Sequence, residues 1–359
     1  MKALILSGGR GIRLRPLTHT IPKQLVPVAN KPILHYVIEN VVEAGIKNIG
    51  IIIDAHTGNQ IKEYVLKQKW RQEVFFEFIT QSAPLGLAHA VKIAQDFIKD
   101  DKFLVYLGDN LIGTGITEFK QEFKEKNLDA LLLLKKVKNP HMFGVVKLDS
   151  SGHIQEIIEK PKEFISPLAL VGIYFFSPQI FLAIESIKPS WRGELEITDA
   201  IKKLLEMKKN VHSKILQTWW IDTGKKDDLL TANILILRKL IRSSCIEGKI
   251  EGDSLIEGRI VIEKGSNIIN STIKGSVVVG KNVRIENSYV GPYVSIGDGC
   301  KIINSHIVNS VILENCVISN VKKMEASLIG KEVRIIQDSR LESVGRFKFT
   351  LSDNSEVHL

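Results

Sequence analysis

The stretch that decides the fold is Met1–Gln24, with the sequence MKALILSGGRGIRLRPLTHTIPKQ. Its residues Ala3–Leu6 are continuously apolar, which is typical of a parallel strand buried on both faces. Three glycines follow this run, where a backbone with positive φ can bring its N–H groups close to a ligand: Gly8, Gly9 and Gly11. Four basic side chains share the same segment: Arg10, Arg13, Arg15 and Lys23. A concave run of N–H donors backed by cations predicts a loop that binds a polyphosphate.

Two known phosphate motifs do not fit this loop. The P-loop ends in Gly-Lys-Ser/Thr, and no such tripeptide follows. The dinucleotide fingerprint G-x-G-x-x-G would begin at Gly9 and needs glycine where Leu14 stands. The glycines alone also fit an ordinary tight turn with surface charges. The spacing of Arg13 and Lys23, with bends at Pro16 and Pro22, favours a functional loop.

Outward from this loop, residues 1–233 alternate strand-like and helix-like stretches, which predicts βαβ units around a mostly parallel sheet. We expect the helices at 33–44, 60–69, 87–98 and 119–126, and the further strands at 49–53, 74–79, 102–107 and 130–135. The fold class is therefore α/β and Rossmann-like. Loops that follow the parallel strands should lie along one edge, where open α/β sheets bind ligands.

A different pattern begins near Ile250. The tetrapeptide Asn-Ser-x-Ile/Val occurs at 270–273, 287–290 and 304–307, at intervals of 17 residues. Each interval divides into three short pieces that open on an aliphatic residue, which predicts a β-solenoid of about four to five coils reaching Gly330. We expect a helix at 226–243 to link this solenoid to the α/β part.

Composition limits the class of protein. The chain has 359 residues, of which 44% are hydrophobic and 25% charged, as in soluble globular proteins. No apolar run approaches the roughly 20 residues of a membrane helix, and no secretory signal precedes the first strand. Three cysteines do not suggest a disulfide framework, so we expect a reducing, cytoplasmic location and no membrane.

The formal charge of +9 raises the question of nucleic-acid binding. The lysines are scattered among glutamates, and aromatic residues make up only 7% of the chain. We therefore expect small anionic substrates rather than nucleic acid as partners.

Two aspartates follow apolar, strand-like runs. Asp109 ends KFLVYLGD, and Asp222 lies in WWIDTG. An aspartate after a strand is commonly a turn former. Two such carboxylates that converge at a sheet edge would suit Mg²⁺, which takes oxygen ligands and retains waters and phosphate oxygens.

The opening segment carries a family resemblance. GGRGIRLRPLT at 8–18 and PKQLVPVANKPIL at 22–34 resemble the signature of sugar-1-phosphate nucleotidyltransferases, GGxGTRLxPLT…PKxLxPVxxKP. The chain as a whole looks most like the long, thymidylyltransferase form of this family, which carries a C-terminal left-handed β-helix of hexapeptide repeats. One departure is Ile12, which stands where the family has threonine and removes a hydroxyl from the loop.

The resemblance implies a reaction. A sugar 1-phosphate, most simply glucose 1-phosphate, attacks the α-phosphorus of a nucleoside triphosphate such as dTTP in line, and pyrophosphate leaves. It implies catalytic roles for Arg13, which would stabilise the pyrophosphate end, and for Lys23, which would bridge the phosphates of both substrates. It also implies Mg²⁺ as the cofactor, held by Asp109 and Asp222.

The resemblance further implies two pockets. The nucleotide would be bound by Leu6, Gly8, Gly9, Gly11, Gln24, Gln81 and Gly86. The sugar phosphate would be bound by Gly144, Glu159, Lys160 and Val171. Without the resemblance, Gln81 would be read as solvated and Glu159-Lys160 as an exposed ion pair. The segment RGELEITD offers Glu194, Glu196 and Asp199, which shape the sugar site or only cap a helix.

We expect a nucleotidyltransferase domain at 1–233, a linking helix and connection at 234–249, the β-helix at 250–343 and a tail at 344–359. The flat aliphatic sides of the solenoid predict a homo-oligomer. Three alternatives stay open: UTP-dependent chemistry with glucose or N-acetylglucosamine 1-phosphate, an acyltransferase on the solenoid that would use His306, and a non-catalytic scaffold. The repeat gives His306 the row position of Thr272 and Tyr289, which favours a structural role.

Overall fold

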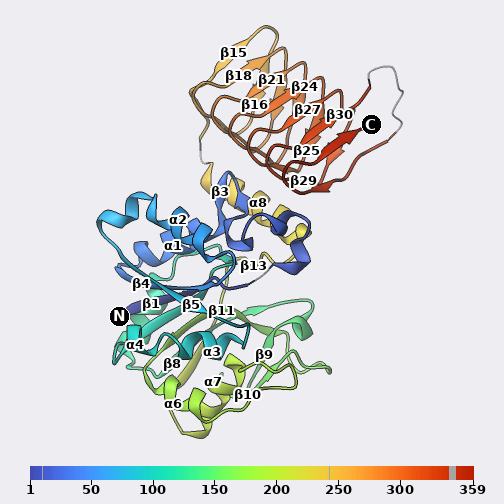
Figure 1. Ribbon diagram of the computed structural model, residues 1–359. Coiled ribbons are helices and arrows are strands. Elements are labelled where there is room, and N and C mark those ends of the chain that lie inside the picture. Colours follow the sequence, from blue (N-terminus) through green and yellow to red (C-terminus); the bar gives the residue numbers. More distant parts are fainter. Residues whose placement is uncertain (10, 242, 339–344) are drawn as a thin grey trace. The chain divides into compact units, whose positions relative to one another are not determined.

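The computed structural model describes residues 1–9, 11–241, 243–338 and 345–359 (Figure 1). Arg10, one of the basic residues of the opening loop, lies outside the described residues. The described chain forms two compact units. The first comprises Met1–Gly9 and Leu34–Asp222, and the second lies within Arg10–Ile33 and Thr223–Leu359. The domain limits expected from the sequence stay a prediction.

A mixed sheet organises the first unit. Its parallel part contains β1 (Lys2–Leu6), β4 (Asn48–Asp54), β5 (Phe75–Gln81) and β6 (Phe103–Leu107). The strand order β10-β9-β11-β6-β1-β4-β5 puts β1 between β6 and β4, both parallel to it. The Rossmann-like α/β class is confirmed, because these parallel strands alternate with helices along the chain. The apolar run of β1 is buried from Ala3 to Leu6, as expected of a central strand.

The other side of this sheet is mostly antiparallel, although β12 pairs in parallel with β8. Strand β11 (Leu168–Phe176) runs antiparallel to β6, β8 and β9. The remaining strands of the unit are β7 (Asn110–Ile112), β8 (Ala130–Lys136), β9 (Gly144–Leu148), β10 (Ile154–Glu159), β12 (Val211–Ile215) and β13 (Trp220–Asp222). β7 and β13 form a two-stranded sheet of their own.

The unit has helices close to each of the four expected ranges, a further helix that begins in RGELEITD, and one at Gln179–Glu185, for which no range was expected. They are α1 (Ile33–Glu43), α2 (Gly58–Leu66), α3 (Leu87–Lys92), α4 (Gln95–Ile98), α5 (Thr117–Glu125), α6 (Gln179–Glu185) and α7 (Ile197–Glu206). The single helix expected at 87–98 is two short helices, because the backbone leaves the helical conformation at Ala94. Short 3₁₀ turns lie at Lys69–Gln72 and Pro140–Met142.

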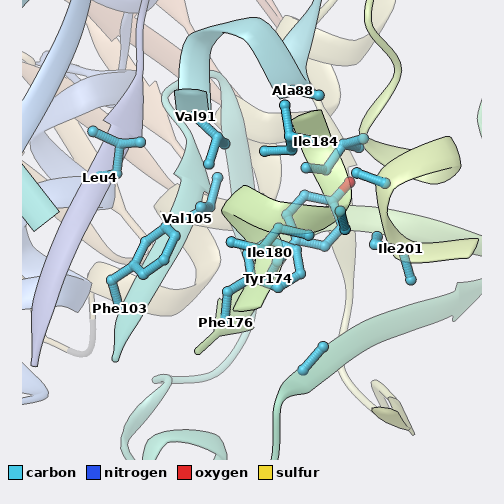
Figure 2. Close-up of a cluster of buried hydrophobic side chains, with 14 of the residues drawn as sticks. Leu4, Ala88, Val91, Phe103, Val105, Tyr174, Phe176, Ile180, Ile184 and Ile201 are labelled. Carbon is cyan, nitrogen blue, oxygen red and sulfur yellow. The ribbon is translucent and has the colours of Figure 1, made fainter. Parts of the chain in front are cut away.

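Apolar side chains from strands and helices form a buried cluster in this unit (Figure 2). Strand residues Val105, Tyr174 and Phe176 pack with Val91 of α3 and Ile180 of α6, and all five are buried. Burial of each such side chain stabilises the fold by about 1.5–3 kcal/mol. Packing in this cluster holds the strands in place, including β1 and β6, whose carboxyl ends precede several predicted site residues.

The C-terminal part of the second unit is the left-handed β-helix that the repeat and the resemblance predicted. One parallel sheet contains β14 (Cys245–Ile246), β17 (Ile260–Ile262), β20 (Val277–Val279), β23 (Val294–Ile296), β26 (Val311–Ile312), β29 (Leu328–Ile329) and β31 (Thr350–Leu351). A second contains β15 (Lys249–Glu251), β18 (Asn267–Ile269), β21 (Arg284–Glu286), β24 (Lys301–Ile303), β27 (Val317–Ser319), β30 (Arg334–Ile336) and β32 (Glu356–His358). The third contains β16 (Leu255–Glu257), β19 (Thr272–Lys274), β22 (Tyr289–Val290), β25 (His306–Val308) and β28 (Met324–Glu325).

Hydrogen bonds between coils explain the repeated Asn-Ser pair. Asn287 adopts a left-handed backbone with φ of 47°, which asparagine tolerates better than most residues. The next residue, Ser288, donates its hydroxyl to the carbonyl of Glu286 (2.7 Å) and accepts the N–H of Ser305 one coil later (3.0 Å). Ser271 makes the equivalent contacts one coil earlier. The motif is therefore a turn that ties each coil to the next.

The solenoid extends further than the repeat indicated. The described residues place seven strands on two faces and five on the third, against an expectation of four to five coils ending near Gly330. The polar tail supplies β31 and β32, which pair with β29 and β30. The tail contains Asn-Ser-Glu-Val at 354–357, but this tetrapeptide is off the 17-residue interval, and its strand joins a different sheet from β19, β22 and β25. The interval therefore did not predict that the tail continues the coils.

The second unit also contains the opening loop and helix α8 (Lys226–Leu240). The loop has 3₁₀ turns at Ile12–Leu14, Leu17–His19 and Lys23–Leu25, followed by a hairpin of β2 (Pro27–Val28) and β3 (Lys31–Pro32). Helix α8 matches the helix expected at 226–243. No helix in the described ranges is long and apolar enough to cross a membrane.

Candidate active site

The first site residues lie at the carboxyl ends of parallel strands of the first unit. Leu6 is the last residue of β1, and Gln81 is the last residue of β5. Gly8 follows β1, and a Cβ on Gly8 would lie 3.5 Å from the side-chain oxygen of Gln81. Gly9 follows and is exposed. The structure thus brings Gly8 and Gln81 together, although 73 residues separate them.

The amide of Gln81 has a fixed orientation. Its Nε2 donates to the carbonyl oxygen of Gly86 (3.3 Å) and contacts Nδ1 of His89 (3.0 Å). Burial lowers the pKa of His89, and the charge of Lys92 lowers it further. Both effects favour the neutral ring, whose unprotonated Nδ1 can accept this bond. The amide oxygen therefore stays an acceptor for an N–H group of a ligand. His89 was not predicted as a site residue, and nothing in the sequence pattern marked it.

Position 86 can hold only glycine without a shift of the surrounding chain. Its φ is +100°, and a Cβ would lie 2.4 Å from the carbonyl oxygen of Leu195. Backbone hydrogen bonds hold the same loop: Leu195 N–H donates to Leu85 (2.8 Å), and Ala88 N–H donates to Leu195 (3.0 Å). The segment RGELEITD therefore braces the loop of Gln81 and Gly86, a role that the sequence did not indicate.

The residues expected to bind the sugar phosphate lie on the hairpin of β9 and β10. Gly144 and Glu159 are directly opposite in the antiparallel ladder. Thr198 at the start of α7 donates its hydroxyl to Oε2 of Glu159 (3.3 Å). Nζ of Lys160 lies 3.6 Å from the other carboxylate oxygen, and the Lys160 backbone adopts φ of +42°. The hairpin and α7 thus bring Gly144, Glu159 and Lys160 together.

Arg192 joins this group. Its guanidinium lies 3.8 Å from Oε1 of Glu159, 3.4 Å from Glu196 and 2.8 Å from Glu194. Burial raises the pKa of Glu159 and the charge of Glu196 adds to that rise, whereas Lys160 and Arg192 oppose it. Glu194 and Glu196, whose role the sequence left open, hold the arginine beside Glu159. Arg192 was missed as a site residue.

Val171 belongs to an irregular part of β11. The ladder with β8 shifts register between Leu170 and Tyr174, and Gly172 adopts φ of +74° against the side chain of Leu107. The side chain of Val171 is fully buried. A ligand at Val171 would therefore meet its backbone rather than its side chain.

The ladder of β7 and β13 places Asp222 opposite the residue that follows Asp109. β13 runs antiparallel to β7 and pairs Asp222 with Asn110, the residue after Asp109. The Asn110 amide donates to Oδ1 of Asp109 (2.7 Å) and its oxygen accepts from the Trp220 indole (2.6 Å). No group of three or more His, Cys, Asp or Glu side chains suited to a metal is found among the described residues. Two carboxylates in this arrangement fit Mg²⁺, which completes its shell with waters and phosphate oxygens.

In the second unit, the opening loop is folded tightly on itself. Gly11 has φ of +62°, and a Cβ there would lie 2.9 Å from Cβ of Lys23. Thr18 donates its hydroxyl to the carbonyl oxygen of Gly11 (2.7 Å). Glycine at position 11 thus lets the start of the loop approach Lys23 closely. Gln24 is buried, and its side-chain oxygen accepts no hydrogen bond from any described residue.

Arg13 and Ile12 are exposed on this loop, Ile12 by 61%. Burial raises the pKa of Asp228 on α8, and Arg13 is among the cations that oppose that rise. No packing accounts for isoleucine at position 12.

The sequence profile of the nucleotidyl transferase family matches residues 2–239. This chain belongs to that family. The match spans all of the site residues proposed here.

Two curated nucleotidyl transferases match over their full lengths. The low-salt glycan biosynthesis nucleotidyltransferase Agl11 of Haloferax volcanii is 43% identical over 361 residues, covering 100% of both chains. A glucose-1-phosphate thymidylyltransferase of Streptomyces antibioticus is 41% identical over 360 residues, covering 100% of this chain and 99% of that protein. The similarity therefore includes the β-helix as well as the α/β part.

A solved structure matches about two thirds of this chain. It is a putative glucose-1-phosphate thymidylyltransferase from Bacillus anthracis in complex with sucrose. The two chains are 33% identical with a TM-score of 0.62, over 69% of this chain and 98% of the other. The shared region is thus close to the whole of the shorter protein.

Proposed function

We propose that this nucleotidyl transferase converts dTTP and glucose 1-phosphate to dTDP-glucose and pyrophosphate. The observation that carries the proposal is the full-length, 41% identity to a protein named glucose-1-phosphate thymidylyltransferase. Retention of Arg13, Lys23, Asp109 and Asp222 supports an active transferase over a decayed scaffold.

The nucleotide is proposed to contact Leu6, Gly8, Gly9, Gly11, Gln24, Gln81 and Gly86. The orientation of the Gln81 amide supports this assignment, since its free oxygen suits the N3–H of thymine. The backbone of Gly86 would complete recognition of the base. The absence of a Cβ at Gly8 would let the ligand approach the chain closely.

The sugar phosphate is proposed to contact Gly144, Glu159, Lys160 and Val171. The Glu159 carboxylate, oriented by Thr198 and Arg192, suits the hydroxyls of a hexose. The ammonium of Lys160 suits the phosphate.

Charge neutralisation is the main task of the protein in this reaction, because both substrates are anionic. The Arg13 guanidinium would bind the β- and γ-phosphates as they leave, since its planar fork matches two oxygens. The Lys23 ammonium would bridge the two reacting phosphates and hold the attacking oxygen in line. Asp109 and Asp222 would hold Mg²⁺, which as a Lewis acid polarises the phosphoryl oxygens.

UTP is the second candidate donor. Uracil presents the same N3–H edge to Gln81 as thymine does and lacks only one methyl, a difference worth about 1–3 kcal/mol in a fitted pocket. The experiment is a pyrophosphate-release panel that crosses dTTP, UTP, ATP, CTP and GTP with glucose, N-acetylglucosamine and other sugar 1-phosphates, with and without Mg²⁺. The highest kcat/KM with dTTP and glucose 1-phosphate supports the proposal. Higher activity with UTP replaces it with the second candidate.

We also propose a cytoplasmic homo-oligomer. The described cysteines are free thiols, which agrees with a reducing compartment. The aliphatic sides of the solenoid suit packing against other copies. A monomeric mass by light scattering at micromolar concentration would contradict the oligomer.

A further inference from the structure

Asn233, in the middle of α8, is fully buried. Its side-chain oxygen accepts the backbone N–H of Ala29 (2.8 Å) and the hydroxyl of Ser295 (2.6 Å). Its amide nitrogen donates to the carbonyl oxygen of Tyr293 (3.3 Å). One buried side chain therefore joins the opening loop to a coil of the solenoid.

On the loop side, Asn233 contacts the turn of the β2–β3 hairpin. Ala29 and Asn30 both have positive φ, 48° and 61°, which is the two-residue turn that suits a tight hairpin. Alanine rarely adopts this conformation, so its N–H needs a partner that holds it there. The Asn30 amide adds a bond to the carbonyl oxygen of Ile296 (2.7 Å).

On the solenoid side, the contacted coil departs from the repeat at two positions. Tyr293 stands in the row of Ser276 and Asn309. Ser295 stands in the row of Val278 and Val311, which are also buried, and puts a hydroxyl where those residues have an apolar side chain. Both departures supply a bond to α8, because Ser295 bonds to Asn233 and the Tyr293 hydroxyl accepts from Arg238 (2.5 Å). The coil sequence is thus adapted to this contact.

The hairpin is close to Lys23 along the chain and is hydrogen-bonded to its surroundings. Val26 N–H donates to the carbonyl of Lys23 (3.2 Å), and Ile33 N–H donates to the carbonyl of Val26 (3.2 Å). Farther along the loop, Thr20 donates its hydroxyl to Asp353 of the last coil (2.7 Å). The loop is therefore tied to the solenoid near both Thr20 and Ala29.

We propose that Asn233 is a positioning residue for the transfer reaction: with Ser295 it holds the β2–β3 hairpin and so fixes the loop that carries Lys23 and Gln24. The proposal rests on the function proposed above. It gives the solenoid a part in the reaction, because the coil at 293–296 supplies the support for the substrate-binding loop.

The test uses the full chain with Asn233→Ala. Hydrogen–deuterium exchange should become about tenfold faster or more for the amides of 25–33, because the Ala29 N–H loses its acceptor. Exchange in the inner strands of the solenoid should not change. In kinetic assays kcat/KM should fall about tenfold to a hundredfold with both substrates, because the phosphate-binding groups are misplaced.

Two serines of neighbouring coils give a matched pair of variants. Ser295→Ala and Ser310→Ala each delete a fully buried hydroxyl, but only Ser295 contacts Asn233. Faster exchange at 25–33 in Ser295→Ala and not in Ser310→Ala supports the proposal. Where Asn233→Ala does not fold, the double variant Asn30→Ala with Ser295→Ala replaces it.

Unchanged exchange at 25–33 in the folded variants would overturn the inference, as would equal effects of Ser295→Ala and Ser310→Ala. The exchange measurement needs no substrate. If the wild-type chain transfers no nucleotide in the panel, the proposed function fails, while exchange still decides whether Asn233 holds the loop.

Discussion

Glu159 lies directly opposite Gly144 in the β9–β10 ladder, and its carboxylate is 3.1 Å from the place that a Cβ of residue 144 would take. The same Cβ would lie 2.7 Å from the methyl group of Thr198, which donates to that carboxylate. Because Gly144 has no side chain, the side chains of Glu159 and Thr198 can approach each other beside it.

Gly144→Ala should therefore displace Glu159 without straining the backbone, because the φ of Gly144 is not in the left-handed region. We expect KM for the sugar 1-phosphate to rise about tenfold, equivalent to ~1.4 kcal/mol, with little change in KM for the nucleotide. Steady-state kinetics with each substrate varied in turn measure this. An equal rise in both KM values would contradict a role limited to the sugar side.

Glu159 also predicts a pH dependence of stability. Burial, with the nearby Glu196, raises its folded pKa above the ordinary glutamate value of 4.5. From that ordinary value up through the folded pKa, the folded state binds more protons than the unfolded state, so this group contributes less stability as pH rises. Glu159→Gln has no such titration. Its Tm relative to wild type should therefore increase as pH rises through the acid range.

Thermal unfolding of both proteins over a pH series measures this difference. Asp199, whose pKa burial and Glu196 also raise, is present in both proteins and cancels to first order. A Tm difference that is constant with pH, or that decreases as pH rises, would contradict the assignment.

The pairing of β13 with β7 predicts that Asp109 and Asp222 act together. Asp109→Asn and Asp222→Asn should each lower kcat by about a hundredfold or more and raise the Mg²⁺ concentration needed for half-maximal rate, because one charged ligand is lost. The control is Asp100→Asn, which changes an exposed aspartate of the first unit. Full activity in either site variant at unchanged Mg²⁺ demand would rule that residue out as a ligand.

The sequence predicted those parts of the site that depend on strand ends. The apolar run of β1 follows from periodicity, and parallel strands bring their ends, with the glycines after β1, to one edge. Gln81, at the end of β5, followed from the resemblance. The pairing of Asp222 with Asn110 joins segments more than a hundred residues apart, and neither strand carries a signal for its partner. The prediction that the two aspartates share one site therefore came from the resemblance and not from periodicity.

Contacts made by residues that belong to no motif could not be predicted from the sequence. Asn233 reads as one polar residue in a helix, and Ser295 as one irregularity in a repeat. Arg192 lies in a charged segment whose acidic residues alone drew attention. The partners that give these residues their roles are distant in the sequence, so the contacts are seen only in the structure.

Gly86 and Gly152 separate two costs of adding a side chain. Both have positive φ, +100° and +85°, but a Cβ at Gly86 would collide with the backbone of Leu195, whereas a Cβ at Gly152 meets nothing within 4 Å. Gly152→Ala should cost only the conformational strain, about 1–2 kcal/mol. Gly86→Ala adds the collision and should cost about 3–5 kcal/mol in total.

Gly86→Ala should also move the loop that holds Gln81, because the carbonyl oxygen of Gly86 accepts a hydrogen bond from the Gln81 amide. The residue that the new methyl group would meet, Leu195, is hydrogen-bonded to Leu85 and Ala88 of the same loop. We therefore expect Gly86→Ala to raise KM for the nucleotide at least tenfold at temperatures where the protein stays folded, and Gly152→Ala to leave that KM unchanged. Denaturant unfolding and nucleotide-dependent kinetics of the two variants measure both effects. Equal losses of stability in the two variants would mean that the loop moves to make room for the added methyl group. An unchanged KM for the nucleotide in Gly86→Ala would contradict a role of Gly86 in base recognition.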